Sequence, residues 1–183
     1  MRRRGFAATS VDDLCAAAGV TKGAFFHHFA SKEALGVALI DDWTETTGVM
    51  FASHPYNFLP DPLDRVFGYI DFRRQILGQP IPEFSCVAGT TVQEAYETSA
   101  PMRDAAERSV KSGFDHVRPH LAQALAAHPV AGVTAESLAQ QFQVAVHGGI
   151  ILAKALNDAA PAREAFDHLE HYLRLMFDRP VTQ

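Results

Sequence analysis

The sequence lacks the features that mark secreted, membrane-spanning or disulfide-stabilised proteins. Its 183 residues include only two cysteines, Cys15 and Cys86, and no CxxC pair. No apolar run approaches the roughly 18 residues that a membrane span needs. The basic start, MRRRGFAATS, has no apolar segment of the kind found in secretory signals. We therefore expect a cytoplasmic protein with two reduced thiols and no membrane partner.

Motifs of common enzymes and metal sites are also missing. The chain contains no G-x-S-x-G, no P-loop and no G-x-G-x-x-G. His27 and His28 are adjacent, so on a helix their side chains diverge by about 100° and cannot easily share an ion. His116 and His120 have helical spacing, but Pro119 disturbs that turn and no acidic residue lies between them. We expect no catalytic residue, no metal site and no cofactor.

Charge is distributed unevenly along the chain. The whole sequence carries a net charge of −5. Residues 1–40 contain five basic and three acidic residues, which leaves −7 for the remainder. A basic head on an acidic body suits a polyanionic partner for the head alone.

Capping signals and apolar spacing predict an all-α fold. Ser10 begins a Ser-x-x-Asp start signal and Gly19 follows, which predicts a helix over residues 10–18. A second short helix is expected from residue 21 or 22 to about 29, and Ser31 caps a long third helix. No stretch alternates with a period of two, so we expect no sheet. The later helices are expected at residues 62–77, 84–97, 99–125 with a kink or break at Pro119, 134–157 and 161–178.

Residues 14–29 fit a helix-turn-helix. Cys15 is small where two helices would cross, Gly19 allows a tight turn, and Val20 is expected to fill the corner. Leu14 and Phe25 would be the apolar anchors. The start of the second helix of such a unit enters the DNA major groove. We therefore expect its hydroxyl, lysine and free N–H groups to bind phosphates.

The surrounding sequence resembles a known regulator family. Residues 9–35, TSVDDLCAAAGVTKGAFFHHFASKEAL, resemble the DNA-binding signature of the TetR family of bacterial transcriptional regulators. Residues 86–105, CVAGTTVQEAYETSAPMRDA, resemble one subgroup of the family's C-terminal domains. The resemblance implies an all-α homodimer, with a helix-turn-helix DNA-binding domain at 1–45. A larger effector-binding and dimerisation domain would follow at 46–183.

The resemblance also implies a function and a set of DNA contacts. The chain would be a ligand-responsive repressor, released from a pseudo-palindromic operator by a small molecule. Lys22 and Lys32 would contact phosphates, while the middle of the second helix would contact bases. The positions carried over from the family are Thr9, Ser10, Thr21, Lys22, Gly23, Ala24, Phe26, His27, His28 and Lys32.

Three departures from the family pattern leave alternatives open. Phe26 replaces the usual tyrosine, and Cys15 replaces the usual alanine. The family normally has a full helix before Gly5, where this sequence has MRRR, so we expect either a start downstream of the true one or a loosely folded head. One alternative is a helical ligand-binding dimer whose truncated head no longer binds DNA. The other is a small all-α enzyme or an unrelated helical binding module.

The resemblance places the dimer interface on the last two helices. We expect residues 134–157 and 161–178 to pair with their symmetry mates as a four-helix bundle, with Gly148 permitting close backbone approach. The residues expected in this interface are Gln141, Val144, Gly148, Ile151, Leu152, Ala155, Phe166, Leu169, Tyr172, Leu173 and Met176.

The family's effector cavity lies inside the C-terminal domain. We expect a planar or largely apolar effector, with Arg74 as an anchor for any carboxylate. Ordinary core packing is the alternative for each aromatic residue, and His147 is either a core or interface histidine or a ligand donor. The expected effector residues are Trp43, Phe51, Phe67, Ile70, Arg74, Cys86, Phe114 and Phe142.

Overall fold

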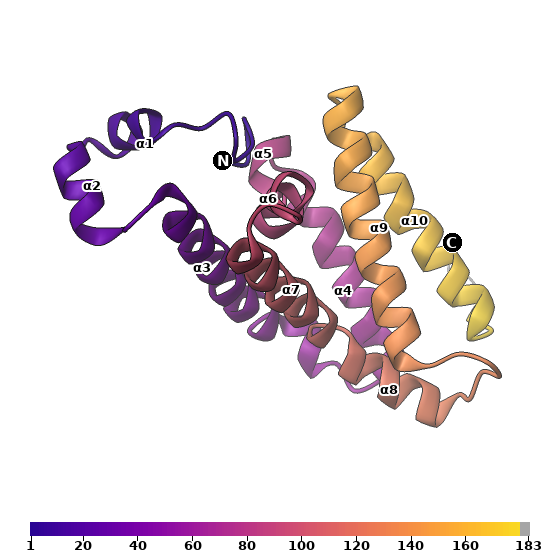
Figure 1. Cartoon of the computed structure of the whole chain (residues 1–183). Coiled ribbons are helices and arrows are strands. Elements are labelled where there is room, and N and C mark those ends of the chain that lie inside the picture. Colours follow the sequence, from indigo (N-terminus) through magenta and orange to yellow (C-terminus); the bar gives the residue numbers. More distant parts are fainter. Residues whose placement is uncertain (180–183) are drawn as a thin grey trace. The chain divides into compact units, whose positions relative to one another are not determined.

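The computed structural model describes residues 1–179, which form helices joined by short connections (Figure 1). These residues contain no strand, so the predicted all-α class is confirmed. Nor does any helix among them have the length and apolarity needed to cross a membrane. The helices are α1 (Val11–Ala18), α2 (Lys22–His28), α3 (Lys32–Ala52), the 3-10 helix η1 (Pro55–Phe58), α4 (Pro62–Ile76), α5 (Ile81–Phe84), α6 (Val87–Ala95), α7 (Ala100–Asp115), α8 (Arg118–Ala127), α9 (Ala135–Leu156) and α10 (Ala160–Met176).

Most helix ends lie where the capping signals predict them. Ser10 Oγ accepts a hydrogen bond from Asp13 N, and the Asp13 carboxylate accepts one from Ser10 N, which completes a capping box. Gly19 ends α1 with a φ of 69°, a conformation that glycine adopts without strain. At the other end of the chain, Thr134 caps α9 and Asn157 closes it in the left-handed conformation.

Two of the expected helices are divided. The helix expected over residues 84–97 is interrupted at Cys86, which has an extended backbone and accepts a hydrogen bond from Gly89 N at its Sγ. Cys86 therefore acts as an N-cap that starts α6 anew. The helix expected over 99–125 is divided into α7 and α8, with Pro119 in the first turn of α8, because proline suits that position.

The chain forms two compact units that are not continuous in sequence. The first unit contains residues 1–47 and 85–111, and the second contains residues 48–84 and those from 112 onward. The division at residue 45 expected from the sequence concerns functional domains and stays a prediction. It did not anticipate that residues 85–111 return to the N-terminal unit.

Each unit has its own core. The first is built of small and β-branched side chains, including Ile40 of α3, Ala88 of α6 and Ala105 of α7. The second is larger and more aromatic, and it lies among α4, α8, α9 and α10. Helices α9 and α10 lie side by side (Figure 1), and Gly149 permits this, since a Cβ there would lie 3.0 Å from Ala162 Cα.

Candidate functional site

Helix α2 presents one side to solvent and one to the head's own core. Phe25 is buried and contacts Phe26 edge-to-face and Phe29 at a tilt. The exposed side includes His27 and His28, whose rings meet edge-on rather than converging on one point. The predicted groove residues Thr21, Lys22, Gly23, Ala24, Phe26, His27 and His28 are all exposed.

The start of α2 has the chemistry of a phosphate site. Thr21 caps the helix by accepting a hydrogen bond from Ala24 N at 3.1 Å, so its own O–H remains available to donate. The positive end of the helix dipole lies there as well. Lys22 forms an exposed ion pair with Asp12 at 2.9 Å. Surface pairs of this kind are weak, so a phosphate can displace the carboxylate.

The two residues before α1 that were predicted to contact DNA have hydroxyl groups that bond within the protein. Ser10 is exposed, but its hydroxyl is engaged with Asp13 in the capping box. Thr9 is buried and its hydroxyl donates to Gly5 O at 2.7 Å. The arrangement therefore does not support Thr9 as a phosphate ligand, because its side chain faces the protein rather than solvent.

Lys32 and Glu94 hold this segment in place. Lys32 Nζ donates to Phe6 O and to a second carbonyl, that of Thr9, both at 3.0 Å, which leaves one N–H for a phosphate. The Glu94 carboxylate of α6 accepts from Phe6 N at 3.1 Å and from Ala7 N at 2.6 Å. Lys32 is thus a structural tie as well as a predicted phosphate contact, a role that its sequence position did not indicate.

Replacing Glu94 by alanine is expected to release this segment. The amides of Phe6 and Ala7 lose their acceptor, so hydrogen exchange at these two residues should accelerate to the rate of exposed amides. The matched control is Glu97→Ala, at a neighbouring exposed carboxylate. Unchanged protection at both amides in Glu94→Ala would show that the tie is not formed in solution.

Two apolar side chains of the head are not covered. Val20 is 45% exposed and Phe26 is 53% exposed. The expectation that Val20 fills the corner of the turn was wrong, since the buried residues there are Cys15 and Phe25. The helix-turn-helix thus has an incompletely covered apolar side among the described residues.

The interface predicted on α9 lies on its exposed side. Val144 is 62% exposed, and Ile151 and Leu152 are about half exposed although all three are apolar. Gly148 lies between them, and a Cβ built there meets nothing within 4 Å. Gln141, Val144, Gly148, Ile151, Leu152 and Ala155 are all exposed and follow one stripe. This stripe on α9 is an exposed, largely apolar face that no other described residue of the chain covers.

The residues predicted on α10 need correction. Phe166, Leu169 and Leu173 are buried in the chain's own second core, and Met176 packs against that core. An amphipathic helix turns its main apolar stripe toward its own core, so these residues are not available to a partner. The exposed apolar residues of α10 are Tyr172, as predicted, and Leu175, which is 70% exposed and was missed.

The predicted effector residues do not form one group. Trp43 and Cys86 belong to the first unit, where both pack against its core. Four of the others, Phe51, Phe67, Ile70 and Phe142, are buried in the core of the second unit, and Phe114 packs against it. Core packing therefore accounts for most of these side chains, and their role in an effector site stays a prediction.

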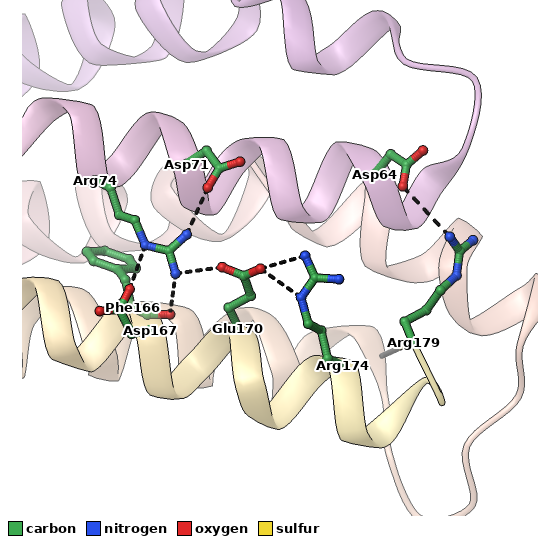
Figure 2. A network of polar contacts seen from close by, with 8 residues as sticks. All are labelled: Asp64, Asp71, Arg74, Phe166, Asp167, Glu170, Arg174 and Arg179. Atoms are coloured by element: carbon green, nitrogen blue, oxygen red, sulfur yellow. Dashed lines mark hydrogen bonds and ion pairs between the residues drawn. The ribbon is translucent and has the colours of Figure 1, made fainter. Parts of the chain in front are cut away.

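Arg74 is already paired with carboxylates, as Figure 2 shows. Its guanidinium lies 2.8 Å from Asp71, 2.8 Å from Asp167 and 2.6 Å from Glu170. Arg174 binds the same Glu170 carboxylate at 2.6 Å. Burial raises the pKa of Glu170, but hydrogen bonds from the two arginines outweigh burial and lower it overall. Arg74 links α4 to α10 and has little capacity left for a ligand.

The adjacent arginine has a different environment. Arg73 donates from Nε and Nη2 to Tyr69 Oη at 2.9 and 2.7 Å, and its guanidinium lies over the Phe51 ring. It forms no ion pair with any carboxylate in residues 1–179. Sequence reasoning missed this contrast because both neighbours are arginines on one helix.

His116, just before α8, and His120, within α8, have separate partners. The His116 ring stacks on Phe51 with centroids 4.7 Å apart. His120 Nε2 bonds Asn57 Oδ1 at 2.8 Å, while its Nδ1 is buried without a partner. Across the described part of the chain, no group of three histidine, cysteine, aspartate or glutamate side chains could hold a metal ion.

Two surface hollows of about 450 Å³ each occur in the second unit. One is lined by residues of the α8–α9 connection and of α9 and α10, including Leu138 and Tyr172. The other lies beside the α4–α10 ion pairs and is lined by Phe67, Arg174 and Arg179 among others. Of the predicted effector residues, Phe67 reaches one of these hollows.

Solved structures of transcriptional regulators have this fold. A TetR-family transcriptional regulator from Agrobacterium tumefaciens is 24% identical with a TM-score of 0.80, over 93% of this chain and 90% of that one. A TetR transcriptional regulator from Chloroflexus aurantiacus is 26% identical with a TM-score of 0.77, over 93% and 86%. The reduced form of Escherichia coli NemR is 22% identical with a TM-score of 0.78, over 92% and 88%. No curated protein matches the sequence.

Two family profiles match the chain and divide it between them. The profile for bacterial regulatory proteins of the tetR family matches residues 1–39. The profile for the C-terminal domain of LmrA/YxaF-like transcriptional regulators matches residues 62–168, which is more than half of the chain. Members of this family are DNA-binding regulators rather than enzymes. The chain belongs to the TetR family of bacterial transcriptional regulators.

Proposed function

We propose that this protein is a cytoplasmic repressor that binds a pseudo-palindromic operator as a homodimer and leaves it when a small molecule binds. The observation that carries the proposal is the exposed side of α2, where a capped helix start, a lysine and two histidines face solvent together. Each subunit would insert one α2 into the major groove, at successive turns of the DNA. Membership of the TetR family supports the other parts of the proposal, which are dimerisation and release by a small molecule.

The second copy is supported by the apolar stripe on α9. Val144, Ile151 and Leu152, with Leu175 of α10, present large apolar side chains that residues 1–179 leave exposed. Exposed apolar patches of this kind mark protein interfaces. A four-helix bundle made of α9, α10 and their symmetry mates would bury them.

Lys22→Ala is expected to weaken binding to all DNA sequences alike. Lys22 is predicted to contact phosphate and not bases, so its loss should reduce the slope of log K against log salt by about 0.9 per lost contact in each head. The slope is measured by fluorescence anisotropy with DNA from the region upstream of the protein's own gene. The salt concentration is varied between 50 and 200 mM, roughly the range over which such contacts weaken.

The control for this test is Lys111→Ala. Like Lys22, Lys111 is exposed and paired with one carboxylate, that of Glu107, but it lies on α7 and outside the head. Its removal should leave the salt slope unchanged. An equal slope in wild type and Lys22→Ala would refute the proposed docking of α2.

A second candidate function is a helical ligand-binding dimer that does not bind DNA. The exposure of Val20 and Phe26 favours it, because uncovered apolar side chains leave the head short of stabilising burial. A mobility-shift assay with the upstream region separates the two functions. Specific binding that non-specific DNA does not displace supports the repressor, and its absence supports the second candidate.

A further inference from the structure

Arg73 of the second unit is a cation without a counter-ion among residues 1–179. The Arg73 guanidinium has five N–H groups, of which Tyr69 Oη accepts two, so three remain. Its flanks are aromatic: the Phe51 ring lies 4.2 Å from Cζ, and the Tyr69 ring lies 5.1 Å away. Nearby Arg74 shows that this region of α4 has carboxylate partners available, yet none of them pairs with Arg73.

A buried amide in the same unit also lacks a partner. Gln143 of α9 is 7% exposed, and its Nε2 has no hydrogen-bond acceptor in the described part of the chain. The amide lies against Gly113, where a Cβ would come within 2.7 Å of Nε2. An unpartnered buried donor is destabilising, so its retention indicates that something else satisfies it.

Two histidines connect these features. His147 lies one turn after Gln143 on α9, and His116 lies one turn after Gly113. Burial lowers the pKa of each ring, to about 4 for His116, and the positive charge of Arg73 lowers the pKa further in both cases. The Asp115 carboxylate opposes this shift at His116. The His116 ring also stacks on Phe51, and the Arg73 guanidinium lies over that same ring.

We infer that Arg73, Gln143, His116 and His147 form the anchor for the carboxylate group of an aromatic effector. This inference rests on the proposed function, which requires an effector but does not specify its chemistry. Arg73 supplies the positive charge, and Gln143 Nε2 supplies a neutral donor. The rest of the ligand would pack near the Phe51 ring, which lies against Arg73 and meets Phe72 edge-on at 5.2 Å.

The ligand class follows from what the cluster lacks. A neutral aromatic compound would leave the guanidinium without a counter-ion, and a cation would be repelled by it. A carboxylate has two acceptor oxygens, so it can satisfy a guanidinium and an amide donor at the same time. The anchor thus lies one residue from Arg74, the position that the sequence indicated.

The test compares three aromatic carboxylates with their amides. The probes are benzoate, 3-phenylpropionate and 2-naphthoate, each beside the amide of the same skeleton, titrated into the full chain by calorimetry. At least one carboxylate should bind more tightly than its amide. Arg73→Gln should remove that preference, weakening the carboxylate roughly tenfold to a hundredfold while leaving the amide unchanged. The matched control, Arg74→Gln, should keep the preference.

Gln143→Leu separates a ligand-binding role from a structural one. Leucine is similar in size and needs no hydrogen bond, so this variant should melt at the same temperature as wild type or higher. Its carboxylate preference should fall. If Gln143→Leu instead lowers the melting temperature and keeps the preference, the amide is structural.

Two results would overturn the inference: no carboxylate preference in wild type, or a preference that survives Arg73→Gln. Calorimetry needs no DNA, so this outcome is independent of operator binding. A chain that binds no operator yet prefers carboxylates through Arg73 would contradict the repressor and leave the anchor standing. A chain that binds its operator but shows no carboxylate preference would support the repressor and contradict the anchor.

Discussion

Gly148→Arg is expected to convert the protein to a monomer and to reduce operator affinity roughly a hundredfold or more. A Cβ at Gly148 meets nothing within 4 Å, so the variant should fold normally as a single chain. In the proposed bundle, however, an arginine would stand between Val144 and Ile151, where the partner's helix must approach. It would place a large, unpaired charge in an apolar interface. Two DNA-binding domains that are no longer joined in one dimer lose the gain in affinity from bivalent binding.

Light scattering at micromolar concentration and a mobility-shift assay measure the two effects. The control is Ala126→Arg, which adds the same side chain at an exposed alanine of α8. It should remain dimeric and bind DNA as wild type does. A dimer in Gly148→Arg with intact DNA binding would mean that the stripe on α9 is not the interface.

Mild acid is expected to destabilise the protein before its carboxylates titrate. An unfolded histidine takes up a proton near pH 6.5, whereas burial keeps the folded pKa of His116 at about 4. Between these values the unfolded chain binds more protons, so the free energy of unfolding falls as the pH falls. The loss reaches up to roughly 3 kcal/mol for this residue. Burial also lowers the pKa of His120 and His147, which adds to the effect in the same direction.

His116→Phe should flatten this dependence. Phenylalanine keeps the stacking on Phe51 but cannot take up a proton. Urea unfolding at pH 7.0, 5.5 and 4.5, spanning about the window between the two pKa values, measures the slope. His171→Phe, at an exposed histidine of α10, is the control and should retain the wild-type slope. Equal slopes in His116→Phe and wild type would show that His116 does not titrate as its environment implies.

The sequence was a good guide to helices because their ends are local. A capping box at Ser10, a glycine at 19 and a proline at 119 act within one turn of the chain. Contacts between distant segments were not predictable in this way. Nothing near residues 85–111 indicates that Ala88 and Ala105 share a core with Ile40.

In the candidate site, too, features set by local sequence were predictable and features set by distant contacts were not. The exposed start of α2 follows from a local motif, and the DNA contacts expected of its residues stay a prediction. Only one partner of Arg74 is local, namely Asp71 three residues before it, whereas Asp167 and Glu170 lie more than 90 residues away and could not be predicted from the sequence. On α10, one signal was present but unused: Leu175 is a large apolar residue outside the stripe of Phe166, Leu169 and Leu173.

The unpartnered amide of Gln143 has an evolutionary consequence. Glutamine and leucine codons differ by a single base, so Gln143→Leu lies within one mutation of the present gene. If the amide serves the effector, that mutation produces a regulator that is at least as stable and responds less. Selection for an unresponsive repressor should therefore recover this substitution repeatedly, because stability and induction are opposed at this position.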